Sequence, residues 1–108
     1  MMVSPHRLKF SDLKPGVKRI EHFKIWNTMK NEMLVGDVVN PSGPGAAQFR
    51  IVGGLTHFSL PQGGPGDEIQ VQYTPSAPGA TDTATIAIVS SDPTRHSFAV
   101  GLTGECKK

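Results

Sequence analysis

Apolar and polar residues alternate most regularly between positions 67 and 75, where the sequence reads DEIQVQYTP. Ile69, Val71 and Tyr73 fall on one face of a two-residue period, while glutamate and glutamine side chains fall on the other. This alternation predicts a strand with one buried face and one face in water. A glycine-rich turn at 63–66 precedes the strand and a proline ends it, because proline cannot donate a hydrogen bond to a continuing ladder.

Shorter patterns of the same kind recur along the chain, separated by turns rich in glycine and proline. A helix is the alternative at 32–39, but three β-branched valines and a central glycine favour a strand there. No helical period of ten or more residues occurs anywhere, so the pattern indicates an all-β, antiparallel sandwich of about seven strands. Besides 67–75, strands or short extended pieces are predicted at 4–10, 17–27, 32–39, 49–51, 58–60, 83–90 and 98–102.

The inward face of each strand follows from its parity. In 17–27 the alternation is imperfect, so we assign Phe23 and Ile25 to the core and expect a bulge near Glu21 that returns Ile20 to the inner face. The residues predicted to be buried together between the two sheets are Ile69, Val71, Tyr73, Ile86, Ile88, Phe98, Val100 and Leu102.

Length and composition fit one domain that covers residues 1–108. The single cysteine, Cys106, excludes an intrachain disulfide and suits a reducing compartment. No apolar run is long enough for a signal peptide or a membrane span. We therefore expect a soluble, cytoplasmic protein.

Charge is unevenly distributed, although the net charge of +2 is too small to predict binding to nucleic acid or to an anionic membrane. The first thirty positions hold seven basic and two acidic residues, and the other positions hold four basic and seven acidic ones. The N-terminal segment is therefore either a solvated strand face or the place where an acidic partner would be attracted.

The order of the motifs resembles the ASH family, named for the abnormal-spindle and Hydin proteins and also found in bacterial chains called choice-of-anchor D. Two positions depart from the family pattern: Trp26 replaces a small polar residue, and 30–33 replace a turn that usually contains glycine. The segments that carry the resemblance are LKF at 8–10, PG at 15–16, FKIWN at 23–27, FRI at 49–51, IQVQYTP at 69–75, Gly79, TIAIVSSDP at 85–93 and VGLTG at 100–104.

The resemblance implies an immunoglobulin-like β-sandwich, related to pilus-chaperone and major sperm protein domains, with a non-catalytic role. It implies a protein-interaction module, a scaffold or adaptor in a cytoskeletal, ciliary or centrosomal assembly. The alternative is a structural or carbohydrate-associated module of a bacterial protein at the cell surface. If the chain is part of a longer protein, tandem copies of similar domains are expected beside it.

The sequence offers no chemistry for an enzyme, a metal or a cofactor. The four histidines lack the spacing of zinc ligands, and 63–66 opens a strand instead of a phosphate-binding helix. No serine nucleophile motif occurs, and Asp67 and Glu68 point to opposite faces of a strand. We expect Cys106 to be a thiol without a catalytic role.

A partner-binding surface is predicted on the outward face of the second strand. If Phe23 and Ile25 face the core, a tryptophan and a lysine stand in solvent on the opposite face, and basic residues of the first strand extend that surface when the two strands pair. Tryptophan and arginine are enriched in binding hot spots, and opposite charge speeds association, so the expected partner is an acidic or aromatic-containing peptide. The predicted surface consists of Arg7, Lys9, His22, Lys24 and Trp26. The alternative is that Trp26 packs under a neighbouring loop and the lysines are only solvated.

Overall fold

A computed structural model describes residues 1–14, 16–29, 31–93 and 96–107, without the side chain of Asp12. Pro15 and Lys30, which belong to two of the predicted turns, lie outside these ranges. Within them the secondary structure comprises strands and one short 3₁₀ turn: β1 (Met2–Ser4), β2 (Arg7–Leu13), β3 (Arg19–Trp26), β4 (Leu34–Val38), η1 (Ala46–Gln48), β5 (Phe49–Gly53), β6 (His57–Leu60), β7 (Asp67–Tyr73), β8 (Thr81–Ser90) and β9 (Ser97–Cys106).

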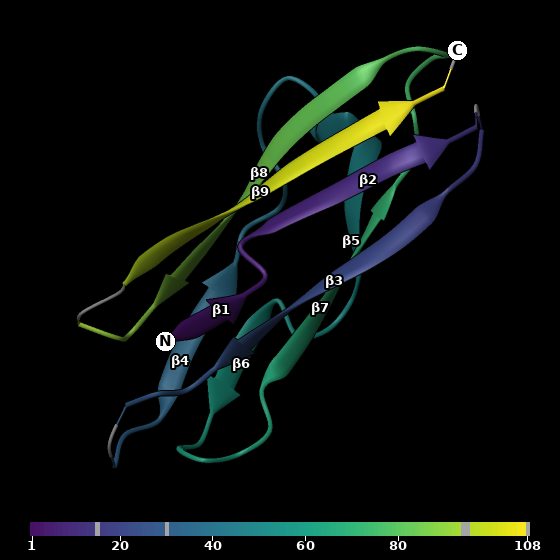
Figure 1. Ribbon diagram of the computed structural model, residues 1–108. Helices are drawn as coiled ribbons and strands as arrows, with labels where there is room; N and C mark the ends of the chain where they lie inside the picture. The colour runs from purple at the N-terminus through teal and green to yellow at the C-terminus, as the bar shows by residue number, and fades with distance from the viewer. Residues whose placement is uncertain (15, 30, 94–95, 108) are drawn as a thin grey trace.

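The strands form two packed sheets, which confirms the predicted immunoglobulin-like sandwich. One sheet has the order β1-β3-β7-β5 and the other has the order β2-β9-β8-β4-β6. The sandwich is elongated, with its strands running roughly along the long axis (Figure 1). Neighbouring strands are antiparallel except β2 and β9, which are parallel, so the expectation of an entirely antiparallel arrangement is wrong at that pair.

The predicted first strand is two strands that belong to different sheets. β1 pairs with β3, whereas β2 pairs with β9 in the other sheet. The chain changes sheets at Pro5, which follows a cis peptide bond. Proline suits this position because it has no backbone N–H to contribute to a ladder.

The bulge expected near Glu21 is absent. β3 pairs with β7 without a register shift from Arg19 to Ile25, and Ile20 consequently faces solvent with 53% of its surface exposed. Phe23 and Ile25 are fully buried, as predicted. Continuous pairing therefore outweighs the burial of one isoleucine, since a bulge would interrupt the ladder.

The core lies between the sheets. Seven of the eight residues predicted to share it are buried, and the eighth, Phe98, is partly buried against the same cluster. Three aromatic rings meet at the end of the core where β7 finishes. Tyr73 stacks on Phe49 at 4.8 Å between ring centroids and lies 5.5 Å from Phe10, so β2, β5 and β7 are held together there.

Candidate partner-binding surface

Trp26 and Lys24 form a pair on the outer face of β3. The Lys24 ammonium lies 5.5 Å from the centre of the Trp26 ring, within the range of a cation–π interaction. Both side chains are half-buried, because they lie against the backbone at Gly66. A Cβ atom at Gly66 would be 2.3 Å from the Ile25 carbonyl oxygen and 3.1 Å from both Lys24 Cε and Trp26 Cδ1, so glycine allows this backbone to approach β3 beside the pair.

The neighbouring strands complete this surface. Met2 of β1 is the cross-strand partner of Trp26, and Glu68 of β7 is the partner of Lys24. His22 is exposed and lies opposite Gln70. Met2, Glu68 and Gln70 were missed by the sequence analysis, because strand parity shows which face a residue occupies and leaves open which residue lies beside it.

Arg7 and Lys9 are not part of this surface. They are exposed on the outer face of β2, in the five-stranded sheet, whereas β3 belongs to the four-stranded sheet. The outer faces of two packed sheets point in opposite directions. The structure therefore brings His22, Lys24 and Trp26 together and places Arg7 and Lys9 on a separate face. We call the first group the Trp26 surface.

A buried polar network joins β7 to β8 at the opposite end of β7. The Tyr73 hydroxyl donates to Asp82 Oδ2 at 2.6 Å, and Ser76 donates to the same carboxylate from both its hydroxyl and its backbone N–H. Burial raises the pKa of the Tyr73 phenol, and the hydrogen bond to Asp82 raises it further. The phenol therefore remains a neutral donor, and this network serves structure.

Asp67 is buried at the start of β7 and has fewer partners. Its Oδ1 accepts a hydrogen bond from the Leu55 backbone N–H at 3.0 Å. Its Oδ2 has no hydrogen-bond partner among the described residues. Burial raises the pKa of this carboxyl, while the Leu55 hydrogen bond opposes the change.

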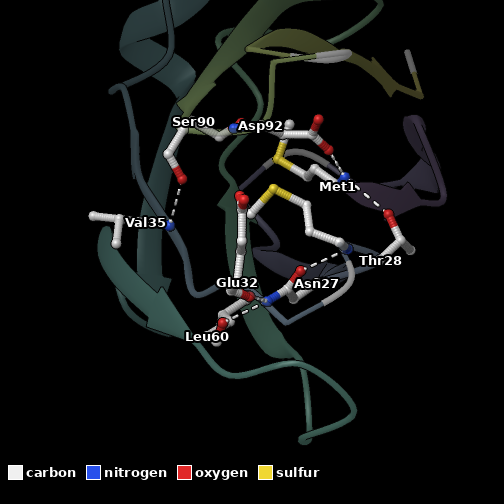
Figure 2. Close-up of polar contacts among 10 residues, drawn as sticks. Met1, Asn27, Thr28, Glu32, Val35, Leu60, Ser90 and Asp92 are labelled. Atoms are coloured by element: carbon white, nitrogen blue, oxygen red, sulfur yellow. Dashed lines mark hydrogen bonds and ion pairs between the residues drawn. The ribbon is translucent and has the colours of Figure 1, made fainter.

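Asn27, in the FKIWN segment, organises the loop that follows β3. Its side-chain amide donates to the carbonyls of Glu32 and Leu60, and its carbonyl accepts from the Met29 N–H. Figure 2 shows the amide directed toward both carbonyls. The side chain thus fixes one loop and attaches it to the end of β6, which gives this motif residue a structural role.

Asp92, in the SSDP segment, is buried beside the first residue. The Met1 ammonium group forms an ion pair with its carboxylate and also donates to Thr28 Oγ1 at 3.0 Å (Figure 2). The preceding Ser91 hydroxyl accepts from the Val35 N–H. These contacts attach the β8–β9 turn to the first residue and to β4, so the SSDP segment also acts in structure.

The described residues contain no group of three or more His, Cys, Asp and Glu side chains arranged to hold a metal ion. His57 contacts Asp37 at 2.8 Å in an exposed pair, and Cys106 is buried within β9 instead of lying on a loose end. No helix in these ranges has the length and apolar character needed to cross a membrane.

Two packed sheets, with β1 in one and β2 in the other, define the class of fold. Among solved structures, the ASH/PapD-like domain of human CEP192 (PapD-like domain 7) is similar with a TM-score of 0.70. The match covers 99% of this chain and 84% of that chain at 11% identity, so it shows a shared fold. The ASH-like fold predicted from the motifs is thereby confirmed. No protein-family model and no curated protein matches the sequence.

Proposed function

We propose that this chain is a non-catalytic module that binds a protein or peptide through the Trp26 surface. The observation that carries the proposal is the half-buried Trp26–Lys24 pair on the outer face of β3, a strand whose inner face already fills the core. The fold shared with the ASH/PapD-like domain of human CEP192 supports an interaction role. The motif resemblance extends the proposal to a scaffold or adaptor in a cytoskeletal, ciliary or centrosomal assembly.

The chemistry of the surface suggests its partner. A tryptophan contributes a large apolar area with little loss of conformational entropy, and an adjacent cation attracts acidic groups. Met2 adds apolar area beside Trp26, and 52% of its surface is exposed. An acidic segment with an aromatic or aliphatic anchor fits this combination.

The test is quantitative affinity capture from cells with the parent chain and single variants. Trp26→Ala and Lys24→Glu should lose a specific captured protein, which is then confirmed with purified components. Ile20→Ala is the matched control for Trp26→Ala, because it also shortens an exposed apolar residue on the outer face of β3. Ile20→Ala should retain the partner, and both alanine variants should keep their stability to within about 1 kcal/mol.

Two results would contradict this proposal. One is equal loss of the partner in Ile20→Ala and Trp26→Ala. The other is a Trp26→Ala variant that loses several kcal/mol of stability and shows no separate binding defect, which would make Trp26 a core residue.

A further inference from the structure

β2 is an edge strand with one unoccupied side. It lies at the end of the five-stranded sheet, and β9 is its one strand neighbour in the described part of the chain (Figure 1). In a parallel pair, alternate residues direct their N–H and C=O groups toward the neighbouring strand. The Gly101 N–H donates to the His6 carbonyl, so His6 is one of the residues whose backbone groups face β9. By alternation, the backbone groups of Leu8 and Phe10 also face β9, and those of Arg7 and Lys9 point away from the sheet.

On the same side of the sandwich, the other sheet also has a strand edge that is partly without a neighbouring strand. β1 covers β3 only from Lys24 to Trp26, so in the described structure the earlier part of β3 has no strand neighbour on that side. A strand added beside β2 would lie next to this uncovered part of β3. Its length is limited, because the β2 register shifts after Phe10 and the Ser11 carbonyl already accepts from Arg19 Nη1 at 3.1 Å.

The side chains along this edge are cationic on the solvent face. Arg7 and Lys9 are exposed, whereas Leu8 and Phe10 are buried. Neither Arg7 nor Lys9 has an ion-pair partner among the described side chains. The two residues therefore present unpaired backbone groups and unpaired positive charges at the same two positions.

We propose that the edge of β2 binds an extended acidic peptide, which adds as a short strand with acidic residues at alternate positions opposite Arg7 and Lys9. Directly opposite residues on adjacent antiparallel strands lie close enough for their side chains to interact, so alternating carboxylates would meet both cations. A second copy of this edge is disfavoured, because it would place like charges opposite each other. The edge is separate from the Trp26 surface and does not depend on it.

The experiment is an NMR titration of the ¹⁵N-labelled chain with a capped heptapeptide of alternating glutamate and valine. A peptide of the same composition with its glutamates in one block separates strand addition from simple charge attraction. The alternating peptide should bind at least about fivefold more tightly. It should slow hydrogen exchange at the amides of Arg7 and Lys9, while the Leu8 amide, already bonded to β9, serves as an internal control.

The Arg7→Glu/Lys9→Glu double variant should bind the alternating peptide at least about tenfold more weakly. Arg50→Glu is the matched control, because Arg50 is an exposed cation on β5, an edge strand of the other sheet. It should leave the affinity unchanged.

Equal binding of the two peptides, or unchanged exchange at Arg7 and Lys9, would overturn the proposal. Absence of binding at about 1 mM peptide would also overturn it. If the perturbed amides gather at Trp26 and Gln70, the proposal for β2 fails while the function proposed for the Trp26 surface stands.

Discussion

A buried carboxylate lies near each end of β7, and the two carboxylates differ in how many hydrogen bonds they accept. At the end of the strand, Tyr73 donates to Asp82, which also receives two hydrogen bonds from Ser76. At the start of the strand, Asp67 receives one hydrogen bond from Leu55, and its second oxygen has none from the described residues. A buried charge is tolerated when hydrogen bonds replace its lost hydration. The comparison therefore separates a satisfied polar network from an incompletely satisfied one.

At the Tyr73 end the ring also packs closely against a glycine. The ring of Tyr73 lies directly over Gly104 of β9, where an added Cβ would be only 2.2 Å from the ring carbon that bears the hydroxyl. This contact aligns the hydroxyl with Asp82, which lies opposite Gly104 in the ladder. Gly104 of the VGLTG segment and Tyr73 of the IQVQYTP segment therefore contribute to the same packing contact.

The largest effect is expected when this packing is disturbed. Gly104→Ala would push the Tyr73 ring away from β9 and strain its bond to Asp82, so it should destabilise the fold by about 1–3 kcal/mol or more. The free energy of unfolding in urea measures this. Gly101→Ala is the matched control in the same strand, because its new Cβ would lie 3.7 Å from Arg7 Cγ, an ordinary contact.

The Gly101→Ala variant should change stability by no more than about 0.5 kcal/mol. If the two alanine variants unfold at the same denaturant concentration, the Tyr73 ring is free to move away from Gly104. The tight packing described for this end of β7 would then be wrong.

Tyr73→Phe removes the hydroxyl and keeps the ring. It deletes one hydrogen bond to the buried Asp82 carboxylate, and it should cost about 1–3 kcal/mol. Adding Asp82→Asn to Tyr73→Phe should cost less than the sum of the two single changes, because the two groups share one interaction. Strict additivity in a double-mutant cycle would show that the hydroxyl and the carboxylate are not coupled.

Strand parity predicts much of the fold, including the burial of two aspartates that were not assigned to the core. Asp82 has the same parity as Ala84 and Ile86, and Asp67 has the same parity as Ile69. Both aspartates are buried, as the alternation indicates. The alternation thus indicated their burial, but aspartate is rarely buried without a hydrogen-bond or ion-pair partner, and the partners of these two lie elsewhere in the sequence. Sequence alone did not reveal that Tyr73 would supply a hydroxyl to Asp82.

The candidate site was less predictable than the core. Parity correctly placed Lys24 and Trp26 on an outer face, since it depends only on neighbours along one strand. The assignment of Arg7 and Lys9 to the same surface required knowing which strands pair. It was wrong because the chain changes sheets at Pro5, so β2 pairs with β9 and not with β3. The predicted burial of Ile20 was wrong for a related reason, because its exposure follows from the uninterrupted pairing of β3 with β7.

The smallest effect is expected at the start of β7, and it depends on pH. The pKa of Asp67 is raised in the folded protein, so the folded state binds this proton more tightly than the unfolded state does. The contribution of Asp67 to stability is therefore most favourable below its ordinary pKa of 3.8, and it declines as the pH rises through the higher folded pKa. Ionisation of Asp67 in the folded protein costs stability, because among the described residues its buried charge has a single hydrogen bond.

Asp67→Asn should remove this part of the pH dependence. Its free energy of unfolding, relative to the parent, should improve as the pH is raised from about 4 to 7, because only the parent must bury a charge. Glu68→Gln is the control, since it removes the same charge from the adjacent, exposed position. Urea unfolding at several pH values measures both differences. If Asp67→Asn and Glu68→Gln show the same pH dependence, the second oxygen of Asp67 is satisfied in solution and the contrast between the two ends of β7 disappears.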